Sequence, residues 1–283
     1  MSSISSQPNI QLNAILSNFT TFRIGGPCKG LVQCSKPEEL LTAIHYFNQQ
    51  NEKFILIGGG SNILVADEGL DSFVICFSGD TPQIVQDGTD LIVCAATSLD
   101  ALALYAAEHG LDGINYCSGI PGTVGGAIAG NAGAFGKQIG DVLASAELIN
   151  FKGSKKEVKQ GYFQFAYRDS ILKVTKEIVI SARLSLVSDQ KDDLIKKRNQ
   201  ILNLRKLKHP DLSKDFCAGS FFRNIEPTSK AGKRQAAGWF LEKAGIKGSI
   251  CGEAFIYDKH ANIIIHNGKA KSSDVMKLSK QMQ

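Results

Sequence analysis

The chain has 283 residues, of which 43% are hydrophobic, and its 32 basic and 27 acidic side chains leave a formal net charge of +5. This length and apolar content allow one large domain or two to three small ones, and they exclude global disorder. The small, dispersed charge excess favours anionic small molecules and is too weak to indicate nucleic-acid binding. No apolar run approaches the length of a membrane span, so no membrane association is expected.

Seven cysteines occur, and no two of them have C-x-x-C spacing. Most lie among apolar residues, as Cys76 and Cys94 do. We therefore expect reduced thiols in the core of a cytoplasmic protein, not disulfides or a zinc site. The first residues lack the basic and apolar regions of a signal peptide. The five histidines show no metal-binding spacing, so no metal is expected.

The ordered part of the chain is expected to begin with a short strand over residues 19–26, which runs into a double-glycine turn. A helix is expected over 35–51. Its apolar residues recur at helical spacing, and Ser35 with Glu38 has the pattern of a capping box.

Residues 54–57 are predicted to form a buried strand that ends in a glycine-rich loop, 58–62. Three glycines directly after a strand are typical of a phosphate-binding loop. This loop lacks the Walker lysine and the G-x-G-x-x-G spacing, and a strand over 63–65, not a helix, is expected to follow. An ordinary Rossmann nucleotide site is therefore disfavoured.

A second glycine-rich stretch, 119–133, follows strands expected over 73–77 and 91–96 and a helix over 98–109. Between its glycines lie only small or apolar residues and one amide, Asn131. Such a run favours close approach of its backbone amides to a ligand or to another segment of the chain. A phosphate-bearing cofactor on the backbone and a tight crossing of two chain segments are both compatible with it.

Strands are expected over 145–151 and 177–186. Between them, 163–170 alternates aromatic residues and is predicted to be a strand that ends near Arg168. That arginine either faces a cleft or is an ordinary surface residue closing a strand.

A basic helix over 189–208 leads into the C-terminal part. There, the small residues Ala218 and Gly219 are expected to allow a close approach of the backbone to another group, beside Ser220. A helix over 231–245, a hairpin of 254–257 with 262–266, and a helix over 272–282 complete the expected elements. The whole reads as an α+β chain with two domains joined near residue 187.

Several short motifs occur together in one order, and in this order they resemble those of the UDP-N-acetylenolpyruvoylglucosamine reductases, flavoenzymes of bacterial peptidoglycan precursor synthesis. The resemblance covers roughly residues 18–280 and rests on Thr20-Thr-Phe-Arg-Ile-Gly-Gly, Gly58-Gly-Gly-Ser-Asn, Gly119-Ile-Pro-Gly-Thr-Val-Gly-Gly-Ala, Asn131-Ala-Gly-Ala, Tyr167-Arg-Asp-Ser, Ala218-Gly-Ser-Phe and Asn267-Gly. Each motif is loose alone, and their agreement in register makes chance very improbable.

The resemblance implies an FAD-binding domain of the vanillyl-alcohol oxidase type over 1–187, with two subdomains divided near 75–80. A smaller α+β substrate-binding domain over 188–283 would follow. The FAD pyrophosphate would lie on the two glycine-rich loops, in agreement with their interpretation as anion-binding backbone. The cofactor-binding residues implied are Arg23, Gly25, Gly58, Gly59, Gly60, Ser61, Asn62, Gly119, Ile120, Pro121, Gly122, Thr123, Gly125, Gly126 and Ala127.

The implied reaction has two halves. NADPH reduces the flavin, and the reduced flavin then reduces UDP-N-acetylglucosamine enolpyruvate to UDP-N-acetylmuramate. Arg168 matches the family arginine that stabilises charge on the substrate carboxylate, and Ser220 matches the serine that supplies a proton. The substrate-binding residues expected are Tyr167, Arg223, Asn224 and Lys243.

The resemblance further implies a cytoplasmic monomer that serves cell wall biogenesis, and thereby cell shape and division. The sequence resembles the shorter subclass, and it ends before the segment that carries a glutamate in the family, so a slowed second half-reaction is expected. Two alternatives stay open: a catalytically impaired flavin-binding homologue, and another flavin oxidoreductase of the same fold.

Overall fold

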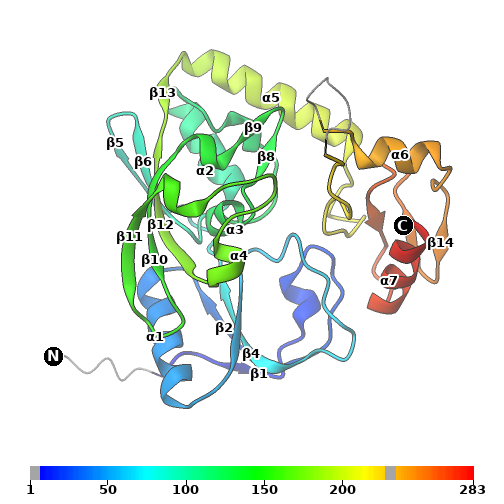
Figure 1. Ribbon diagram of the computed structural model, residues 1–283, viewed down its shortest axis with the longest axis horizontal. Coiled ribbons are helices and arrows are strands. Elements are labelled where there is room, and N and C mark those ends of the chain that lie inside the picture. Colours follow the sequence, from blue (N-terminus) through cyan, green and yellow to red (C-terminus); the bar gives the residue numbers. More distant parts are fainter. Residues whose placement is uncertain (1–6, 227–233) are drawn as a thin grey trace. The chain divides into compact units, whose positions relative to one another are not determined.

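The computed structural model describes residues 7–226 and 234–283 (Figure 1). The chain forms two compact units. Among the described residues, the first comprises 7–13, 29–59 and 72–203, and the second comprises 14–28, 60–71, 204–226 and 234–283. Each unit has its own hydrophobic core.

This division differs from the expected boundary at residue 187. Two N-terminal segments, 14–28 and 60–71, group with the C-terminal residues. The reason lies in packing, because Phe22 and Ile24 are buried in the same core as Ile263. Nothing in the local sequence of 14–28 indicates that partner.

The first unit is built around a five-stranded antiparallel sheet in the order β11-β10-β12-β6-β5. In β12, Ile180, Ala182 and Leu184 are buried and alternate with more exposed residues, as the sequence pattern predicts. The short helix α3 lies against β6 and β12. The bounds are β5 Ile84–Asp87, β6 Asp90–Cys94, β10 Leu143–Ile149, β11 Lys155–Lys159, β12 Ile178–Ser185 and α3 Val124–Ala129.

A second sheet has the order β1-β2-β4-β3, in which β3 and β4 are parallel. Helix α1 buries Leu40, Ile44 and Phe47. The elements are β1 Gln11–Leu12, β2 Cys28–Cys34, α1 Pro37–Gln49, β3 Phe54–Ile57 and β4 Leu70–Phe77. Smaller elements of the first unit are α2 Leu99–Glu108, β7 Leu111–Asp112, β8 Gly133–Ala134, β9 Lys137–Gln138, α4 Leu172–Thr175 and β13 Val187–Ser188, with 3-10 turns at Asn115–Cys117, Ile139–Asp141 and Gln160–Phe163.

The second unit contains a small antiparallel sheet in the order β14-β15-β16. The carboxylate of Asp67 accepts hydrogen bonds from the Ser272 backbone N–H at 2.9 Å and from the Ser272 hydroxyl at 2.7 Å, which fastens the first turn of α7. The bounds are a 3-10 turn at Leu16–Phe19, α6 Ala237–Lys243, β14 Ile250–Cys251, β15 Ala254–Ile256, β16 Ile264–Ile265 and α7 Ser272–Gln281. Helix α5, Lys191–Lys208, runs from the residues of the first unit into those of the second.

Most expected helices and strands are present with shifted ends, including α1, α2, α5, α7 and the β15–β16 hairpin. The strands expected over 19–26, 63–65 and 163–170 are wrong, because these segments form turns and irregular loops. Glu39, not Glu38, caps α1, since its carboxylate accepts the Ser35 N–H at 2.7 Å. Helix α6 begins only at Ala237, and part of the longer helix expected there, 231–233, lies outside the described residues.

The cysteines have the core environment that was expected. Six of the seven free thiols are buried. Burial raises the pKa of the Cys34 thiol to about 12 and raises the pKa values of Cys76, Cys94 and Cys217. Protonated buried thiols are weak nucleophiles, so these residues contribute packing and not chemistry.

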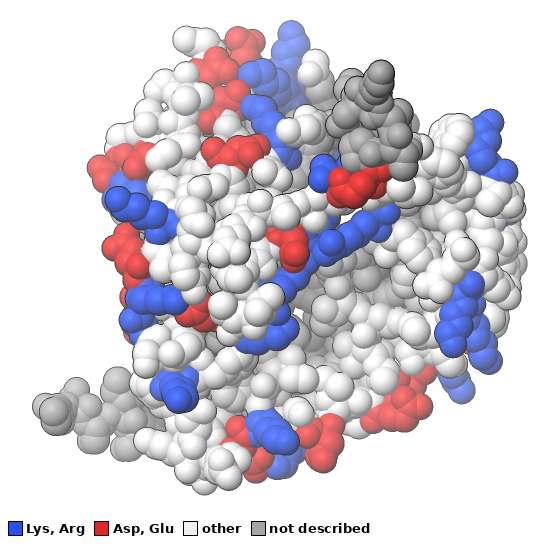
Figure 2. Space-filling model, viewed as in Figure 1, with Lys and Arg blue, Asp and Glu red and all other residues white. Residues whose placement is uncertain are grey.

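The surface carries charges of both signs. Figure 2 shows acidic and basic side chains interspersed over the face that it draws. Within the described residues, none of the helices has the length and hydropathy needed to cross a membrane.

Candidate active site

The two glycine-rich loops meet within the first unit. A β-carbon on Gly58 would lie 2.6 Å from Thr123 Oγ1, and one on Gly59 would lie 3.1 Å from Gly122 Cα. Side chains at either position would push the loops apart, so glycine is required here by close approach. Two loops more than sixty residues apart thus form one backbone surface.

The second loop is fastened to the start of α2. The Val124 N–H donates to Thr97 O at 2.9 Å, and the Leu99 N–H donates to Gly122 O at 3.0 Å. Thr123 is the N-cap of α3, and its hydroxyl accepts the Gly126 N–H at 3.3 Å. The loop is therefore held rigidly by hydrogen bonds at its C-terminal end.

Only part of the 119–127 stretch offers free amides. The Gly119 N–H donates to Asp100 Oδ1 at 2.6 Å, and the Gly125 N–H donates to Ala95 O at 2.9 Å. The amides of Ile120, Gly126 and Ala127 likewise have acceptors within the protein. In this unit, as far as the structure describes it, the Gly59, Gly122 and Thr123 amides have none. These three amides are therefore the ones available to an anionic group.

Gly125 has a packing role that the sequence did not reveal. Its β-carbon position lies 3.1 Å from the Ala95 side chain, so glycine lets α3 pack closely against the end of β6. Pro121 lies in the turn that precedes α3. These residues shape the loop, and direct cofactor contact for them stays a prediction.

The other predicted cofactor residues belong to the second unit. The Thr21 N–H donates to Gly60 O at 3.1 Å, and a β-carbon on Gly60 would lie 1.9 Å from Phe19 O. The turn that contains Thr20 therefore packs directly on the turn that contains Ser61 and Asn62. A β-carbon on Gly25 would lie 2.8 Å from the Val65 side chain, so this glycine also marks a close contact.

Thr20 provides a signal that sequence reasoning missed. The residue is 5% exposed, and its buried hydroxyl oxygen has no hydrogen-bond partner among the described residues. A buried hydroxyl without a partner is costly unless a ligand completes its hydrogen bond. Within the second unit, this hydroxyl is a candidate hydrogen-bond partner for a phosphate-bearing cofactor such as FAD.

The same turn holds Arg23 in a left-handed conformation, with φ of 53°. Its guanidinium lies 5.8 Å from the centre of the Phe216 ring. The buried imidazole of His266 accepts the Gly268 N–H at Nδ1 (2.9 Å), so its Nε2–H donates to Phe22 O at 2.6 Å. This bond fastens the backbone beside Arg23.

Arg168 lies in a tight turn of the first unit. Its φ of 55° is in the left-handed region, which is uncommon for a residue with a side chain. The guanidinium donates from Nη2 to Gly133 O at 2.6 Å and lies 5.6 Å from the centre of the Tyr167 ring. Non-glycine residues in strained conformations cluster at functional sites. The conformation therefore supports a functional role for this arginine.

Ser220 lies in a loop of the second unit that the buried Asn262 holds. The Asn262 side chain accepts the Phe222 N–H at 2.9 Å and donates to Phe222 O at 2.8 Å. Gly219 precedes the serine with φ of 79°, which makes the turn possible. Ser220 is exposed, and within the described part of the chain its hydroxyl has no hydrogen-bond partner. The hydroxyl is thus free to meet a ligand.

The remaining predicted substrate residues also lie in the second unit. Asn224 Oδ1 accepts the Ala237 N–H at 3.2 Å, which ties this loop to the start of α6. Lys243 lies on the same helix with its ammonium group 5.8 Å from the Trp239 ring centre. Arg223 is exposed beside Asn224. Contact of these three residues with the diphosphate of a substrate stays a prediction.

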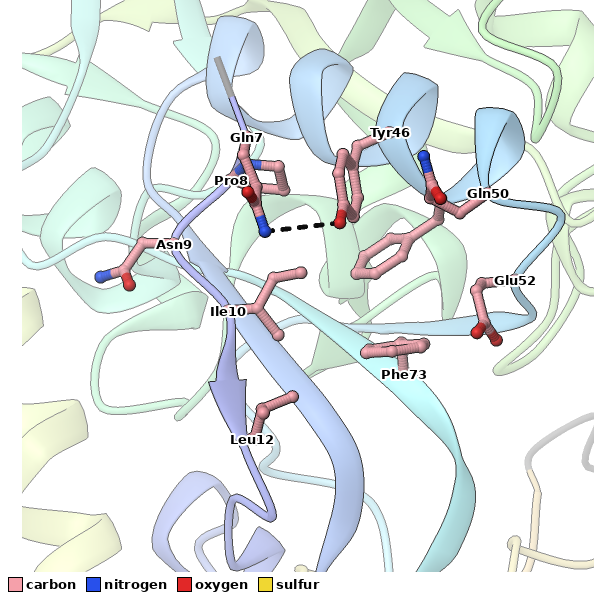
Figure 3. A pocket seen from close by; sticks show the side chains of 10 residues that line it. Gln7, Pro8, Asn9, Ile10, Leu12, Tyr46, Gln50, Glu52 and Phe73 are labelled. Atoms are coloured by element: carbon pink, nitrogen blue, oxygen red, sulfur yellow. Dashed lines mark hydrogen bonds between the residues drawn. The ribbon is translucent and has the colours of Figure 1, made fainter. Parts of the chain in front are cut away.

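A separate pocket of about 710 Å³ lies in the first unit and is not the predicted site. Figure 3 shows the Gln7 amide directed toward the Tyr46 hydroxyl, with which it makes a hydrogen bond of 3.4 Å. Ile10, Phe47 and Phe73 also line this pocket. None of the residues predicted to bind cofactor or substrate does so.

Comparison with known proteins decides the family. Residues 28–159 match the family model described as FAD binding domain, and 211–283 match UDP-N-acetylenolpyruvoylglucosamine reductase, C-terminal domain. The chain is 34% identical over 275 residues to the reductase of Caldanaerobacter subterraneus subsp. tengcongensis, covering 97% of this chain and 87% of the relative. The chain belongs to the UDP-N-acetylenolpyruvoylglucosamine reductase family.

Further relatives agree with this membership. The reductase of Prochlorococcus marinus is 37% identical over 97% of this chain and 91% of its own length. The crystal structure of the reductase from Thermus caldophilus superposes with a TM-score of 0.80 at 31% identity, covering 95% of this chain and 93% of that one. The expected α+β fold with an FAD-binding domain is thereby confirmed.

Gly58→Val tests the contact between the two glycine-rich loops in this family member. The β-carbon alone would lie 2.6 Å from Thr123 Oγ1, so the loops must separate. Overpacking of this kind costs about 1–3 kcal/mol. When this free energy opposes the loop arrangement that binds FAD, the Kd for FAD rises by roughly 5- to 150-fold. The measurement is FAD Kd from flavin absorbance after dialysis. Gly161→Ala, where an added β-carbon meets nothing within 4 Å, is the control.

Proposed function

We propose that this protein is an FAD-dependent oxidoreductase that reduces UDP-N-acetylglucosamine enolpyruvate to UDP-N-acetylmuramate with NADPH. This is a step of peptidoglycan precursor synthesis and hence of cell wall biogenesis. The observation that carries the proposal is identity of 34–37% over 97% of the chain to two reductases of this name. The catalytic and binding roles of individual residues are part of the proposal.

FAD, when bound, supplies the hydride that reduces the substrate double bond, after receiving one from NADPH. The protein's part is to bind the diphosphate without a large positive charge. We assign the Gly59, Gly122 and Thr123 amides of the first unit to it, because none of them has an acceptor in the described residues. The Thr20 hydroxyl of the second unit, also without a partner there, is a separate candidate for a hydrogen bond to the cofactor. Backbone amides that converge on an anion are sufficient for this task.

Arg168 is assigned to the substrate carboxylate. When hydride adds to the enolpyruvyl double bond, negative charge develops on the carboxylate as an enediolate. A planar guanidinium can give that carboxylate two hydrogen bonds. The contact to Gly133 O occupies Nη2, and the left-handed turn fixes the direction in which the side chain leaves the backbone.

Ser220 is assigned to protonation of the neighbouring carbon. Its hydroxyl is exposed on a loop whose backbone is held by Asn262 on both sides of Phe222, so it can donate without rearrangement. Arg223, Asn224 and Lys243 supply hydrogen-bonding groups of the same unit for the diphosphate of the substrate. We also propose that the protein acts as a monomer in the cytoplasm, where NADPH and UDP-sugars are found.

The proposal is tested by two anaerobic mixing steps on the purified protein. NADPH should bleach the absorbance of bound FAD, and UDP-N-acetylglucosamine enolpyruvate should then restore it with formation of UDP-N-acetylmuramate. Bleaching without recovery would indicate a flavin-binding homologue that lacks the second half-reaction. Bleaching of the oxidised flavin by an alcohol instead of by NADPH would indicate a different oxidoreductase on this fold. Bleaching followed by stoichiometric product supports the proposed reaction.

A further inference from the structure

Asn131 is a buried amide in the glycine-rich part of the first unit. The residue is 1% exposed and its backbone is left-handed, with φ of 43°. Its Nδ2 group donates to Gln138 Oε1 and to Ala166 O, both at 2.9 Å. Its Oδ1 accepts the Gly140 N–H at 3.2 Å. The amide thus uses both donors and its acceptor inside the protein.

One of these bonds reaches the turn that carries Arg168. Ala166 and Asp169 close this turn with two reciprocal backbone hydrogen bonds of 3.1 Å. Asn131 holds the carbonyl of Ala166 at the first corner. The other end of the arginine is held by the same segment, because Arg168 Nη2 donates to Gly133 O at 2.6 Å. Residues 131–133 therefore fix both the backbone and the guanidinium of Arg168.

We infer that Asn131 is a positioning residue for Arg168, which it holds in the strained turn that aims the guanidinium. This inference rests on the role proposed for Arg168 in the reduction of the enolpyruvyl substrate. A non-glycine residue in the left-handed region persists only where surrounding contacts determine it. Asn131 supplies such a contact from outside the turn, across 35 positions of sequence.

The neighbouring contacts do not replace it. Ser170 Oγ donates to Ala129 O at 2.8 Å and anchors the end of the turn, and the Lys173 ammonium group contacts Arg168 O. Both act on the C-terminal half of the turn. Asn131 donates to the Ala166 carbonyl, so its loss removes this support from the N-terminal half and leaves that half held by the backbone bonds between Ala166 and Asp169.

Asn131→Asp is the sharpest variant. It keeps the size of the side chain and the tolerance for a left-handed backbone, but it places an oxygen against the acceptors Ala166 O and Gln138 Oε1. A displacement of the guanidinium by about 1 Å should slow re-oxidation of the flavin by the enolpyruvyl substrate by roughly 10- to 100-fold. Flavin reduction by NADPH, which does not use the substrate carboxylate, should stay near the wild-type rate.

The control is Asn150→Ala. Asn150 Oδ1 accepts the Lys152 N–H at 2.9 Å and the Ser154 N–H at 3.0 Å in the turn between β10 and β11, so this variant removes a structural amide from the same unit. We expect it to leave both half-reactions near wild type. Equal slowing of both half-reactions in Asn131→Asp would mean a general structural role and overturn the inference.

A double-mutant cycle with Arg168→Ala separates the two proposals. If Asn131 acts through the arginine, Asn131→Asp slows re-oxidation in the wild-type background and adds nothing when Arg168 is already alanine. If the double variant slows re-oxidation by the product of the two single effects, the inference for Asn131 is overturned. An Arg168→Ala variant with normal re-oxidation would instead contradict the role of Arg168 itself. Should Asn131→Asp not fold, Asn131→Gly keeps the backbone conformation and enters the same cycle.

Discussion

Ser220→Ala is expected to separate the two half-reactions of this reductase. Flavin reduction by NADPH needs no proton from the protein to the substrate carbon, so its rate should be unchanged. Re-oxidation by the enolpyruvyl substrate should fall by about 10²–10⁴, the contribution of a positioned acid. Stopped-flow absorbance of the flavin measures both rates on one sample.

The geometry of the loop explains why the effect should be confined to the hydroxyl. Asn262 fixes the backbone on either side of Phe222, and the Thr21 hydroxyl donates to Cys217 O at 2.8 Å on the other side of Ser220. Removal of one exposed oxygen therefore leaves the loop in place. Ser213→Ala is the control, because the Ser213 hydroxyl is exposed and bonds Asp211 at 2.8 Å.

Stability and cofactor binding of the Ser220→Ala variant are measured as controls. The alanine variant should retain the thermal unfolding temperature and the FAD affinity of the wild type. If Ser220→Ala slows flavin reduction and re-oxidation to the same extent, the serine is a structural turn residue, and another group must protonate the substrate.

Arg168→Lys is expected to slow re-oxidation by roughly 10²–10³, the usual loss when one group that stabilises developing charge is removed. Lysine keeps the positive charge but cannot bond Gly133 O and a carboxylate with one planar fork. The variant should also bind the enolpyruvyl substrate more weakly. With substrates that lack the carboxylate, the wild type and the variant should re-oxidise the flavin at the same rate.

Arg183→Lys is the matched control for this substitution. Arg183 lies on β12 and contacts Asp87 at 3.0 Å and Asp90 at 2.8 Å on the partly exposed surface of the sheet. Ion pairs of this kind contribute little to stability, so both half-reactions should be unaffected. If Arg168→Lys re-oxidises the flavin at the wild-type rate, a positive charge alone is sufficient and the planar guanidinium has no role.

Local sequence predicted several of the regular elements of this protein. The apolar run with Ser98 before it and Gly110 after it predicted the limits of α2 to within one residue at each end, because capping and periodicity act over a few residues. Alternation in β12 gave its buried face for the same reason. The order of short motifs also indicated the family, which the comparisons confirm.

Tertiary structure decided the conformations at the candidate site. Aromatic alternation over 163–170 predicted a strand, but the hydrogen bond between Asn131 and Ala166 helps to hold Arg168 in a tight left-handed turn. Likewise, 19–26 is not a strand, and within it the Phe22 carbonyl accepts a hydrogen bond from His266, 244 residues away in sequence. Such contacts join residues that are distant in sequence, and no local propensity contains information about them.

In the glycine-rich loops, local sequence and tertiary structure each decided part of the outcome. Their composition indicated close approach of backbone, and the structure shows what approaches: Gly58 meets Thr123, and Gly125 meets Ala95. Which amides remain free for a cofactor depends on the hydrogen bonds that the rest of the fold makes, as at Gly119 and Gly125. Sequence thus indicated a close backbone approach, and the packing of α2, α3 and β6 decided which amides have no acceptor within the described residues, because each amide has only one proton to donate. That these amides bind the cofactor stays a prediction.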